Sequence, residues 1–313
     1  MPFAISNVRS SILKLKAKKS PWPDKLKPII FKYIPQNILD TISFIYKACL
    51  KVHNTPRALK ESNVVFKPKQ GKNSYQEAKS FRPISLSNYL KKGLEKLLVE
   101  QMDLALEDYP IHRNQHGFQR FLDIQAAFDT ICPKHIKASL LKHGVDPDLA
   151  EFYYNYITNR HLTTTIGGHT HTITVGIGFP QGGVCSAKFW IIAFNEAIEI
   201  INEYGVTGQG FADYCGPTIG GDNTHEMYKS MQRMLNKLYH WGEGKNLKFN
   251  PSKTVAVLFS KKCKPKQKFL KLGGKFIKHE NKVKYLGVTL DKRLSWRDHI
   301  NDKINTCKAM LLM

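Results

Sequence analysis

Hydrophobic residues recur at helical spacing in several long stretches of the chain. Leu90, Leu94, Leu97 and Leu98 are separated by 4, 3 and 1 positions and give one apolar face to a helix that follows FRPISL. A second helix is expected from about Gln36 to Val52, and a third in DPDLAEFYYNYI, whose aspartates favour its N-terminus. GGVCSAKFWIIAFNEAIEIINEYGV is the longest helical pattern, and MYKSMQRMLNKLYHW is another.

Shorter apolar runs between these helices predict strands. NVVFK is a strand that ends at Pro68, FLDIQAAF is a strand that enters a helix, and VTGQGFADY is a strand that enters a turn. TTTIGGHTHTITVGI predicts a hairpin that turns at Gly167 and Gly168, and TVAVLF predicts a further strand. Because helices and strands do not alternate strictly, the expected fold class is α+β rather than a doubly wound sheet.

Length and composition indicate a folded protein. The 313 residues correspond to one large or two ordinary domains, which bury a core without disulfides. No run reaches the roughly 18 apolar residues of a membrane helix, and the N-terminus lacks the apolar region of a secretory signal. We therefore expect an intracellular protein, cytoplasmic or nuclear, that is not secreted and does not engage a membrane. The six cysteines are scattered without a CxxC pair, which argues against a disulfide framework or a zinc knuckle.

Basic residues outnumber acidic ones and concentrate at the two flanks of the chain. The formal net charge is +23. Residues 1–60 hold 12 basic and 2 acidic side chains and residues 261–313 hold 15 and 4, whereas residues 121–210 hold 5 and 8. Such a field attracts polyanions, so nucleic acid is the first partner to test; a merely solvated cationic surface is the alternative.

Two aspartates stand at the ends of predicted strands. Asp123 ends the run FLD, and Asp213 lies in FADY. Carboxylates that project from neighbouring strand ends are suited to hold two divalent cations for displacement at phosphorus. The alternative is that each aspartate forms a turn or caps a helix. His169 and His171 share one face of a predicted strand, but no third ligand for zinc accompanies them.

Seven short motifs follow one another in a distinctive order: NVVFKPKQGK, FRPISL, LDIQAAFD, GFPQGGVCS, FADY, LKFNPSKTVAVLF and VKYLGVTLD. Together they closely resemble the fingers, palm and primer-grip motifs of the reverse transcriptases of retrotransposons without long terminal repeats, and the jockey type is the nearest. The resemblance covers roughly residues 60 to 300. It implies a right-hand polymerase fold, with fingers, an antiparallel palm sheet flanked by helices, and a partial thumb.

The resemblance also implies an organisation along the chain and a set of partners. A basic lead-in occupies residues 1–60, the fingers region 61–120, the palm 121–260, and a primer-grip hairpin with the start of the thumb 261–313. The implied partners are an RNA template, a DNA primer and deoxynucleoside triphosphates. The implied cofactor is Mg²⁺ or Mn²⁺, and the oligomeric state is left open.

Three residues match the family's catalytic positions. Asp123 matches the first catalytic aspartate, which binds both metals, and Asp213 matches the aspartate of the turn that shares them. Lys253 in NPSKT matches a lysine near the leaving pyrophosphate, where an ammonium group can neutralise or protonate developing charge. Without the family context, Lys253 would be read as one more exposed lysine.

Five residues match positions that contact the nucleotide. Arg82 in FRPISL matches the fingers arginine that lies against the triphosphate, which a guanidinium meets in a bidentate manner. Lys67 or Lys69 is a second phosphate contact, and the sequence leaves the choice between the two open. Gln181 and Gly182 in FPQGG match the loop that packs against template and nucleotide, where a missing side chain permits close backbone approach.

Two further motifs concern the sugar and the primer. Phe128 matches the bulky gate that sits under the incoming sugar and discourages a 2′-hydroxyl; its alternative role is that of a core aromatic. Tyr285, Leu286 and Gly287 in KYLGV match the hairpin that holds the primer end, with Tyr285 as the candidate contact. Simple strand packing is the competing role for this hairpin.

The chain departs from the family pattern in several places. Two adjacent aspartates are usual in the FADY turn, but the second position is Tyr214, a neutral phenol and a poor magnesium ligand. HGFQR runs directly into FLDIQ, which indicates a deletion before Phe121. CGPTIGG replaces an apolar strand, and Ala187 and Lys188 stand where proline and an apolar residue are usual. We expect a truncated, degenerate domain without a preceding endonuclease, whose activity is sharply reduced or lost.

Three hypotheses follow for the function. By lineage, the chain is an RNA-directed DNA polymerase that uses two metals held by Asp123 and Asp213. The alternative is a non-catalytic remnant that still binds nucleic acid through its basic flanks. A third is a chain that does not fold stably, because a deleted helix exposes more surface than a marginal stability of about 5–15 kcal/mol can absorb.

Both nucleic-acid hypotheses predict that RNA or DNA binding weakens steeply with salt. Each neutralised phosphate releases counterions, so the logarithm of the binding constant should fall linearly with the logarithm of the salt concentration, by about 0.9 per duplex phosphate contact. Fluorescence anisotropy of a labelled duplex, titrated between about 50 and 200 mM salt, measures this slope. A binding constant that does not change with salt would contradict both hypotheses.

Overall fold

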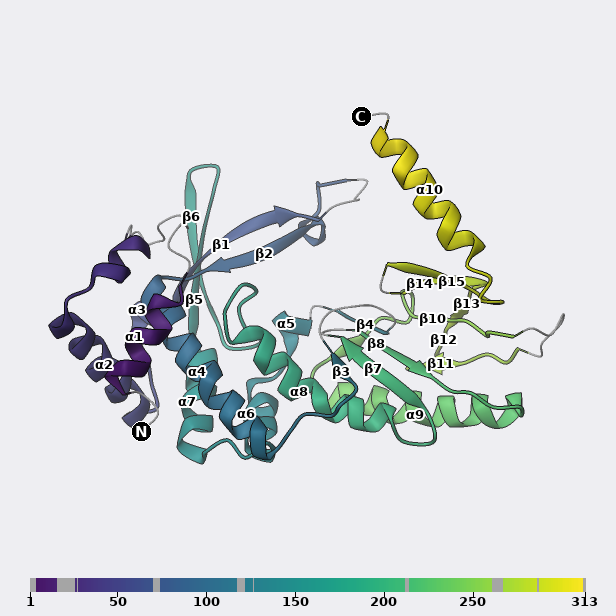
Figure 1. Ribbon diagram of the computed structural model, residues 1–313, viewed down its shortest axis with the longest axis horizontal. Helices are drawn as coiled ribbons and strands as arrows, with labels where there is room; N and C mark the ends of the chain where they lie inside the picture. The colour runs from purple at the N-terminus through teal and green to yellow at the C-terminus, as the bar shows by residue number, and fades with distance from the viewer. Residues whose placement is uncertain are drawn as a thin grey trace. The chain divides into compact units, whose positions relative to one another are not determined.

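The computed structural model describes residues 4–15, 26, 28–69, 74–116, 122–125, 127–211, 214–260, 267–285 and 287–311 (Figure 1). Helices and short sheets are mixed along the chain, so the expected α+β class is confirmed. The chain divides into two compact units, and each is considered by itself. The first comprises Met1–Ile111 with Phe128–Ala193, and the second comprises His112–Ala127 with Phe194–Met313. The division into fingers, palm and thumb stays a prediction.

Helices of the first unit begin and end close to where the hydrophobic spacing predicts them. α2 (Gln36–Lys51) and α4 (Tyr89–Asp108) coincide with two predicted helices. α7 (Pro147–Ile157) follows Asp146, whose carboxylate accepts a hydrogen bond from the Leu149 amide at 3.1 Å and caps the helix. The other helical elements of this part of the chain are α1 (Ile5–Leu13), α3 (Arg57–Lys60), α6 (Pro133–Lys142), and 3-10 turns at Pro28–Tyr33 and Ala78–Ser80. α5 (Ala127–Thr130) and α8 (Ser186–Ile201) contribute residues to both units.

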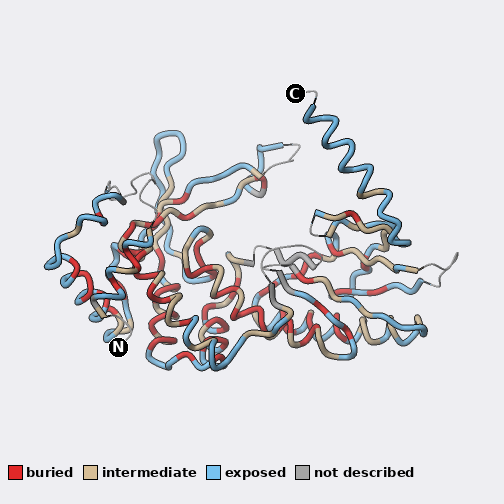
Figure 2. Tube along the Cα trace, in the orientation of Figure 1, coloured by how far each residue is buried: buried red, intermediate tan, exposed pale blue. Residues whose placement is uncertain are grey.

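The core of the first unit lies along the apolar face of α4. Leu94, Leu97 and Leu98 are completely buried there, as are Phe152 and Tyr153 of α7 (Figure 2). The Tyr153 hydroxyl donates a hydrogen bond to the Leu98 carbonyl, so its polar atom is satisfied inside the core. The predicted leucine spacing is therefore confirmed as a packing face.

A four-stranded sheet completes the first unit, in the order β2–β1–β5–β6. β1 (Glu61–Pro68) pairs antiparallel with β2 (Phe81–Leu86) and parallel with β5 (Arg160–Ile166). β5 pairs antiparallel with β6 (His169–Val175), and the hairpin turns at two glycines with φ angles of 57° and 82°. Two successive positive φ angles are those of a type I′ turn, so the predicted hairpin is confirmed.

The second unit is built on a five-stranded sheet in the order β3–β7–β8–β4–β9. Its strands are β3 (Gln115–His116), β4 (Leu122–Gln125), β7 (Thr207–Phe211), β8 (Tyr214–Thr218) and β9 (Lys248–Phe249). Only β3 and β7 pair in parallel; the other neighbours are antiparallel. β4 thus lies beside β8, in agreement with an antiparallel-dominated sheet.

The segment CGPTIGG forms a strand despite its poor strand residues. Gly216, Pro217 and Thr218 pair with Gln209, Gly208 and Thr207 of β7. The segment is therefore poor in strand-forming residues, as expected, but it still pairs with β7 as a strand.

The longest helical pattern does not give the longest helix. α8 spans 16 residues because it begins only at Ser186, whereas α9 (Thr224–Gly244) spans 21 residues. Phe194 of α8 packs edge-on against Trp241 of α9, with ring centroids 5.9 Å apart, and the Trp241 indole donates a hydrogen bond to Glu196 at 2.9 Å. In the described part of the chain, no helix combines the length and the apolar character that crossing a bilayer requires.

Short hairpins follow α9 towards the C-terminus. The predicted strand TVAVLF is reduced to β10 (Val255–Ala256), which pairs with β13 (Lys278–His279). β11 (Lys271–Leu272) pairs with β12 (Lys275–Phe276), and β14 (Lys282–Tyr285) pairs with β15 (Val288–Asp291). α10 (Arg297–Leu311) is the last described element and has no buried residue.

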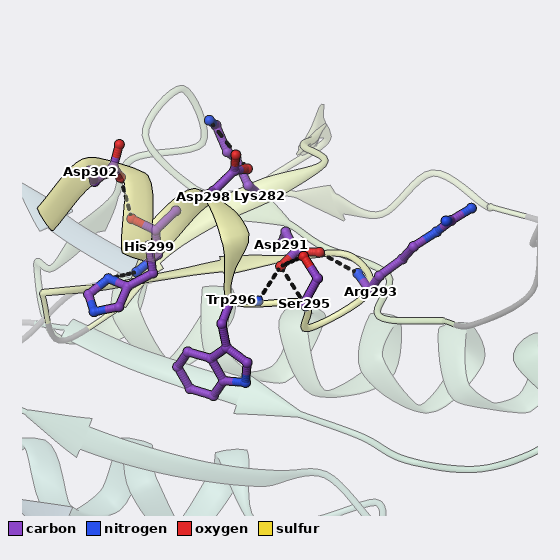
Figure 3. A network of polar contacts seen from close by, with 9 residues as sticks. Lys282, Asp291, Arg293, Ser295, Trp296, Asp298, His299 and Asp302 are labelled. Atoms are coloured by element: carbon purple, nitrogen blue, oxygen red, sulfur yellow. Dashed lines mark hydrogen bonds and ion pairs between the residues drawn. The ribbon is translucent and has the colours of Figure 1, made fainter. Parts of the chain in front are cut away.

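One carboxylate organises the connection between β15 and α10 (Figure 3). Asp291 accepts hydrogen bonds from the amides of Arg293, Ser295 and Trp296 at 3.0, 2.8 and 3.3 Å, and from the Ser295 hydroxyl at 3.2 Å. Trp296 has a φ angle of 64°, a strained value for a bulky residue. These hydrogen bonds hold the strained turn in place and set the start of α10.

Further contacts fix the first turns of α10 to the β14–β15 hairpin. The Thr289 hydroxyl donates to Asp302 at 2.8 Å, the Thr289 amide donates to the His299 ring at 3.3 Å, and Lys282 forms an ion pair with Asp298 at 3.4 Å (Figure 3). The hairpin and this end of the helix therefore form one polar assembly.

Replacing Asp291 by alanine should loosen this turn and the first turn of α10. Without the acceptor, the amides of Ser295 and Trp296 lose their partner, and the strain at Trp296 is no longer compensated. Hydrogen–deuterium exchange should become faster in residues 293–300 and stay unchanged in α4. Asp298→Ala, which removes one ion pair of the same region and leaves the Asp291 hydrogen bonds in place, is the comparison and should have a smaller effect. Equal exchange in the Asp291 variant and the parent would contradict this role.

Candidate functional site

The loop that carries FPQGG is held by backbone hydrogen bonds to two other segments. The Gly178 amide donates to the Ile131 carbonyl at 2.9 Å, and the Phe179 amide donates to the Phe128 carbonyl at 2.8 Å. Gly178 has a φ angle of 63°, and a Cβ there would collide with the Phe128 carbonyl, so glycine is required. The far side of the loop meets β2, where the Ser85 amide donates to the Gln181 carbonyl at 2.7 Å.

A buried carboxylate of α4 fixes the second half of this loop. Glu95 is only 1% exposed, and its two oxygens accept from the Val184 amide and the Tyr156 hydroxyl, each at 2.6 Å. The Glu95 carbonyl also accepts from the Cys185 thiol at 3.1 Å. Burial raises the pKa of the Tyr156 hydroxyl well above its usual value, so it stays a hydrogen-bond donor. Glu95 was not predicted, because its partners are 61 and 89 positions away.

A second charged group of α4 is buried beside Glu95. Lys91 is 2% exposed, its ammonium donates to the Ser62 hydroxyl at 3.1 Å, and it lies 5.6 Å from the centre of the Tyr156 ring. Burial lowers the pKa of Lys91 to about 8, and the neighbouring Glu95 carboxylate offsets part of this effect. The two charges thus enter the core as a partly compensated pair.

Phe128 lies in an aromatic cluster. Its ring is edge-on to Phe179 at 5.0 Å and stacked on Trp190 at 5.7 Å, and the side chain is half-buried. Phe128 therefore takes part in aromatic packing at the edge of the buried core. The gate role stays a prediction, and the exposed remainder of the side chain leaves room for it.

The next residue, Asp129, holds the side chain of Gln181. The Gln181 amide nitrogen lies 3.2 and 3.0 Å from the two carboxylate oxygens of Asp129. Partial burial raises the pKa of the Asp129 carboxyl, which stays in part exposed to solvent, whereas the hydrogen bond from Gln181 and the charges of Arg160 and Lys69 act in the opposite direction. Asp129 was missed in the sequence; its position directly after Phe128 was the available signal.

Arg160 is a buried cation at the base of the same region. It is 4% exposed, and it donates to the carbonyls of Ile157 and Ile177 at 2.9 and 2.6 Å. Burial lowers its pKa to about 10, and the negative charge of Asp129 offsets part of this effect, so Arg160 stays protonated at neutral pH. A cavity of about 330 Å³ opens here. It is lined by Asp129, Arg160 and Gln181 together with apolar residues of β1, β5 and β6.

The predicted phosphate contacts lie on the β1–β2 hairpin. Lys67 and Arg82 are direct cross-strand partners, so their side chains leave the same face of the hairpin, and both are exposed. Neither forms an ion pair within the described residues. Lys69 is half-buried, its amide donates to the Ser80 carbonyl at 2.8 Å, and its charge acts on Asp129. Gly182 has a φ angle of 101° and lies against the Ser85 carbonyl of β2.

In the second unit, the backbone of Asp123 is part of β4. Its cross-strand partner in β8 is Tyr214, the residue that follows Asp213. Asp213 and Leu286 lie outside the described residues. The two carboxylates predicted from the sequence, those of Asp123 and Asp213, would be a suitable set of oxygen donors for Mg²⁺ or Mn²⁺. Within the described residues, no three His, Cys, Asp or Glu side chains gather as a metal site, and the pair predicted from the sequence stays a prediction.

The remaining predicted residues also lie in the second unit. Lys253 is exposed in the turn after β9, where its amide donates to the Asn250 carbonyl at 3.2 Å. Tyr285 ends β14 and pairs with Val288, and Gly287 has a φ angle of 78°, so the predicted hairpin is present. Tyr285 also lines a largely apolar cavity of about 440 Å³ that includes residues of β7, β8 and α9. His169 and His171 are both exposed.

A family model described as "Reverse transcriptase (RNA-dependent DNA polymerase)" matches residues 67–290. The chain belongs to this reverse transcriptase family. It is 25% identical to the RNA-directed DNA polymerase from mobile element jockey of Drosophila melanogaster, over 95% of this chain and 36% of the relative. It is 24% identical to the probable RNA-directed DNA polymerase from transposon BS of the same species, over 98% and 38%.

A third relative is the retrovirus-related Pol polyprotein from type-1 retrotransposable element R1 of Bradysia coprophila, 23% identical over 94% of this chain and 32% of the relative. The resemblance to retrotransposon reverse transcriptases of the jockey type, inferred from the motif order, is confirmed by these relatives. The chain spans about a third of the length of the curated relatives it matches.

The buried Lys91 predicts a specific pH dependence of stability. Its pKa is lower in the folded chain than the ordinary 10.5, so the unfolded chain binds more protons between about pH 8 and 10.5, and stability rises with pH in this window. Relative to Lys91→Met, the free energy of unfolding of the parent should increase by about 2 kcal/mol from pH 7.5 to about 9.5. Urea titrations at the two pH values measure this difference. An identical pH response in the two proteins would contradict it.

Proposed function

We propose that this chain is a polymerase domain for RNA-directed DNA synthesis, in which a primer 3′-hydroxyl attacks the α-phosphorus of a deoxynucleoside triphosphate. A new P–O bond forms, the bond to the β-phosphate oxygen breaks, pyrophosphate leaves, and the hydroxyl proton passes to solvent. The observation that carries the proposal is the β4–β8 register. It sets Asp123 opposite the residue that follows Asp213, and the family match covers both segments.

Asp123 and Asp213 would hold Mg²⁺ or Mn²⁺ through carboxylate oxygens. When bound, such ions would lower the pKa of the attacking hydroxyl and neutralise the negative charge that develops on the phosphoryl oxygens. The contribution of the chain itself is Asp123 on β4, opposite Tyr214 of β8, the residue that follows Asp213 in the sequence. Lys253, exposed after β9, is proposed to act on the leaving pyrophosphate.

The β1–β2 hairpin is proposed to bind the triphosphate. Like charges placed directly across two strands repel each other, and Lys67 and Arg82 form such a pair without an anion among the described residues. A phosphate that lies against both side chains would remove this repulsion and receive charge-assisted hydrogen bonds. Lys69 is the weaker candidate, because its charge already acts on Asp129.

The other predicted residues complete the proposal. Gln181 and Gly182 would face the nucleotide and template, Phe128 would discriminate at the sugar, and the hairpin of Tyr285, Leu286 and Gly287 would hold the primer end. The partners are an RNA template and a DNA primer, and the excess of basic residues supports their binding. In this proposal, residues 61–120 form the fingers, 121–260 the palm, and 261–313 the primer grip and the start of the thumb.

A non-catalytic remnant is the second candidate function, and Tyr214 is the observation that favours it. A phenol replaces a carboxylate beside Asp213 and takes a negative charge away from the metals. The deletion before Phe121 would also remove a segment that directly precedes Asp123 in the sequence. Such a remnant would keep the basic hairpin and the basic C-terminal segment, and with them its affinity for nucleic acid.

Primer extension separates these two functions. With a DNA primer on an RNA template and Mg²⁺ or Mn²⁺, we expect weak extension by the parent and its loss in Asp123→Ala. Tyr214→Asp should raise the rate by 10-fold or more, about 1.4 kcal/mol of transition-state stabilisation, because it restores an anionic group.

The control is Asp40→Asn on α2, which removes an exposed carboxylate elsewhere in the chain and should leave extension unchanged. If the parent and the Tyr214 variant are both inactive but bind the duplex, the remnant function is correct. Extension that persists in Asp123→Ala would contradict the proposed catalytic role.

A further inference from the structure

Asp129 has no role in any motif that the sequence assigned, yet it is the partner of a proposed nucleotide contact. We propose that Asp129 is a positioning residue that turns the Gln181 carboxamide so that its carbonyl oxygen accepts a hydrogen bond from a donor group of the nucleotide. This inference rests on the proposed function. Both residues belong to the first unit, so the contact does not depend on the second.

The geometry of the contact fixes which end of the carboxamide faces Asp129. An ionised carboxylate only accepts hydrogen bonds, and the amide group of glutamine is the end that donates. The Gln181 amide nitrogen lies 3.2 and 3.0 Å from the two Asp129 oxygens, so one nitrogen is shared between both. The opposite orientation would bring the carbonyl oxygen against two anionic oxygens and is therefore excluded while Asp129 is ionised.

The backbone of each partner is also held. The Gln181 carbonyl accepts from the Ser85 amide at 2.7 Å, which ties the loop to β2. On the other side, the Phe179 amide donates to the Phe128 carbonyl at 2.8 Å, immediately before Asp129. The side-chain contact therefore closes a ring of hydrogen bonds, and neither partner can move far from the other without breaking one of them.

Charges from several elements surround Asp129. Arg160 of β5 is buried and fixed by two carbonyl groups, Lys69 follows β1, and His171 of β6 lines the same cavity. The two cations favour the ionised carboxylate, against the loss of water that disfavours it. The ionised form is the one that orders Gln181, so the surrounding charges support the positioning role.

The ordered carboxamide determines the chemistry of what Gln181 can recognise. With its nitrogen directed to Asp129, the remaining polar atom of the carboxamide is the acceptor Oε1, and Gln181 lines a cavity of about 330 Å³ whose walls are largely apolar. An acceptor selects a hydroxyl or amino group and disfavours a carbonyl or phosphate oxygen. The structure therefore assigns to Gln181 a donor group on the sugar or base of the nucleotide, whereas the triphosphate is left to Lys67 and Arg82.

The contact itself can be tested in the full chain without a nucleotide. In nitrogen-15-labelled protein, the side-chain amide signals of Gln181 are identified by their absence in Gln181→Met. We expect a hydrogen-bonded, shifted proton signal in the parent, and its return to the position of a free amide in Asp129→Asn. The matched control is Asp40→Asn, which removes a comparable contact with Gln36 of 2.9 Å and should leave the Gln181 signals in place. Unchanged Gln181 signals in Asp129→Asn would overturn the proposal.

The positioning role is tested by deoxynucleotide binding to the same proteins with template and primer present. Asp129→Asn should weaken binding about fivefold, because its side chain can hold the carboxamide in either orientation. Gln181→Met combined with Asp129→Asn should be no weaker than Gln181→Met alone, because the two residues act in series. As pH falls and Asp129 is protonated, affinity should decrease in the parent and change less in Asp129→Asn. Melting curves check that each variant is folded.

The outcomes separate this inference from the proposed function. Nucleotide binding that Asp129→Asn leaves unchanged, or additive effects of the two substitutions, would overturn the positioning role while the polymerase function stands. A parent that shows the Gln181 contact but binds no deoxynucleotide would overturn the proposed function, and the positioning role with it. A deoxynucleotide analogue that lacks the sugar 3′-hydroxyl distinguishes the two donor sources. If Asp129→Asn no longer weakens binding of the analogue, the donor is on the sugar. If Asp129→Asn still weakens its binding, the donor is on the base.

Discussion

The Glu95 carboxylate is the interaction on which the candidate site of the first unit depends. A carboxylate that is 1% exposed is costly to bury unless donors replace its water, and here a phenol of α7 and an amide of the FPQGG loop do so at 2.6 Å each. Removing either partner would leave an unsatisfied charge in the core. The loop is therefore held against α4 because the buried Glu95 carboxylate needs the hydrogen bond that the loop donates.

From this fixed loop, a series of contacts leads to the residues proposed to act on the nucleotide. Glu95 holds Val184, the loop carries Gln181 three residues earlier, and Gln181 meets Asp129 next to Phe128. Arg160 supports Asp129 from β5 with its positive charge. The site is thus made of segments far apart in sequence, and its geometry is set by hydrogen bonds between polar groups, of which Glu95 and Arg160 are buried.

In the second unit, backbone pairing positions the strand that carries Asp123. β4 and β8 are neighbours in one sheet, and their register brings Asp123 opposite Tyr214. Gly216 and Pro217 of β8 pair with Gln209 and Gly208 of β7, so a composition that is unfavourable for a strand does not prevent pairing in this sheet. Tyr214 pairs with Asp123 of β4 and with Phe211 of β7, so a phenol at this position is compatible with the sheet.

The sequence by itself determined the elements whose signals are local. Leucine spacing determined α4, a pair of glycines determined the β5–β6 turn, and the order of seven motifs determined the family. Only the tertiary structure decided which partners the charged groups meet. Glu95, Arg160 and Asp129 form hydrogen bonds with residues that are distant in the sequence. Spacing reports the face of a helix or strand, whereas the desolvation of a charge and the donors that compensate it exist only after the chain has folded.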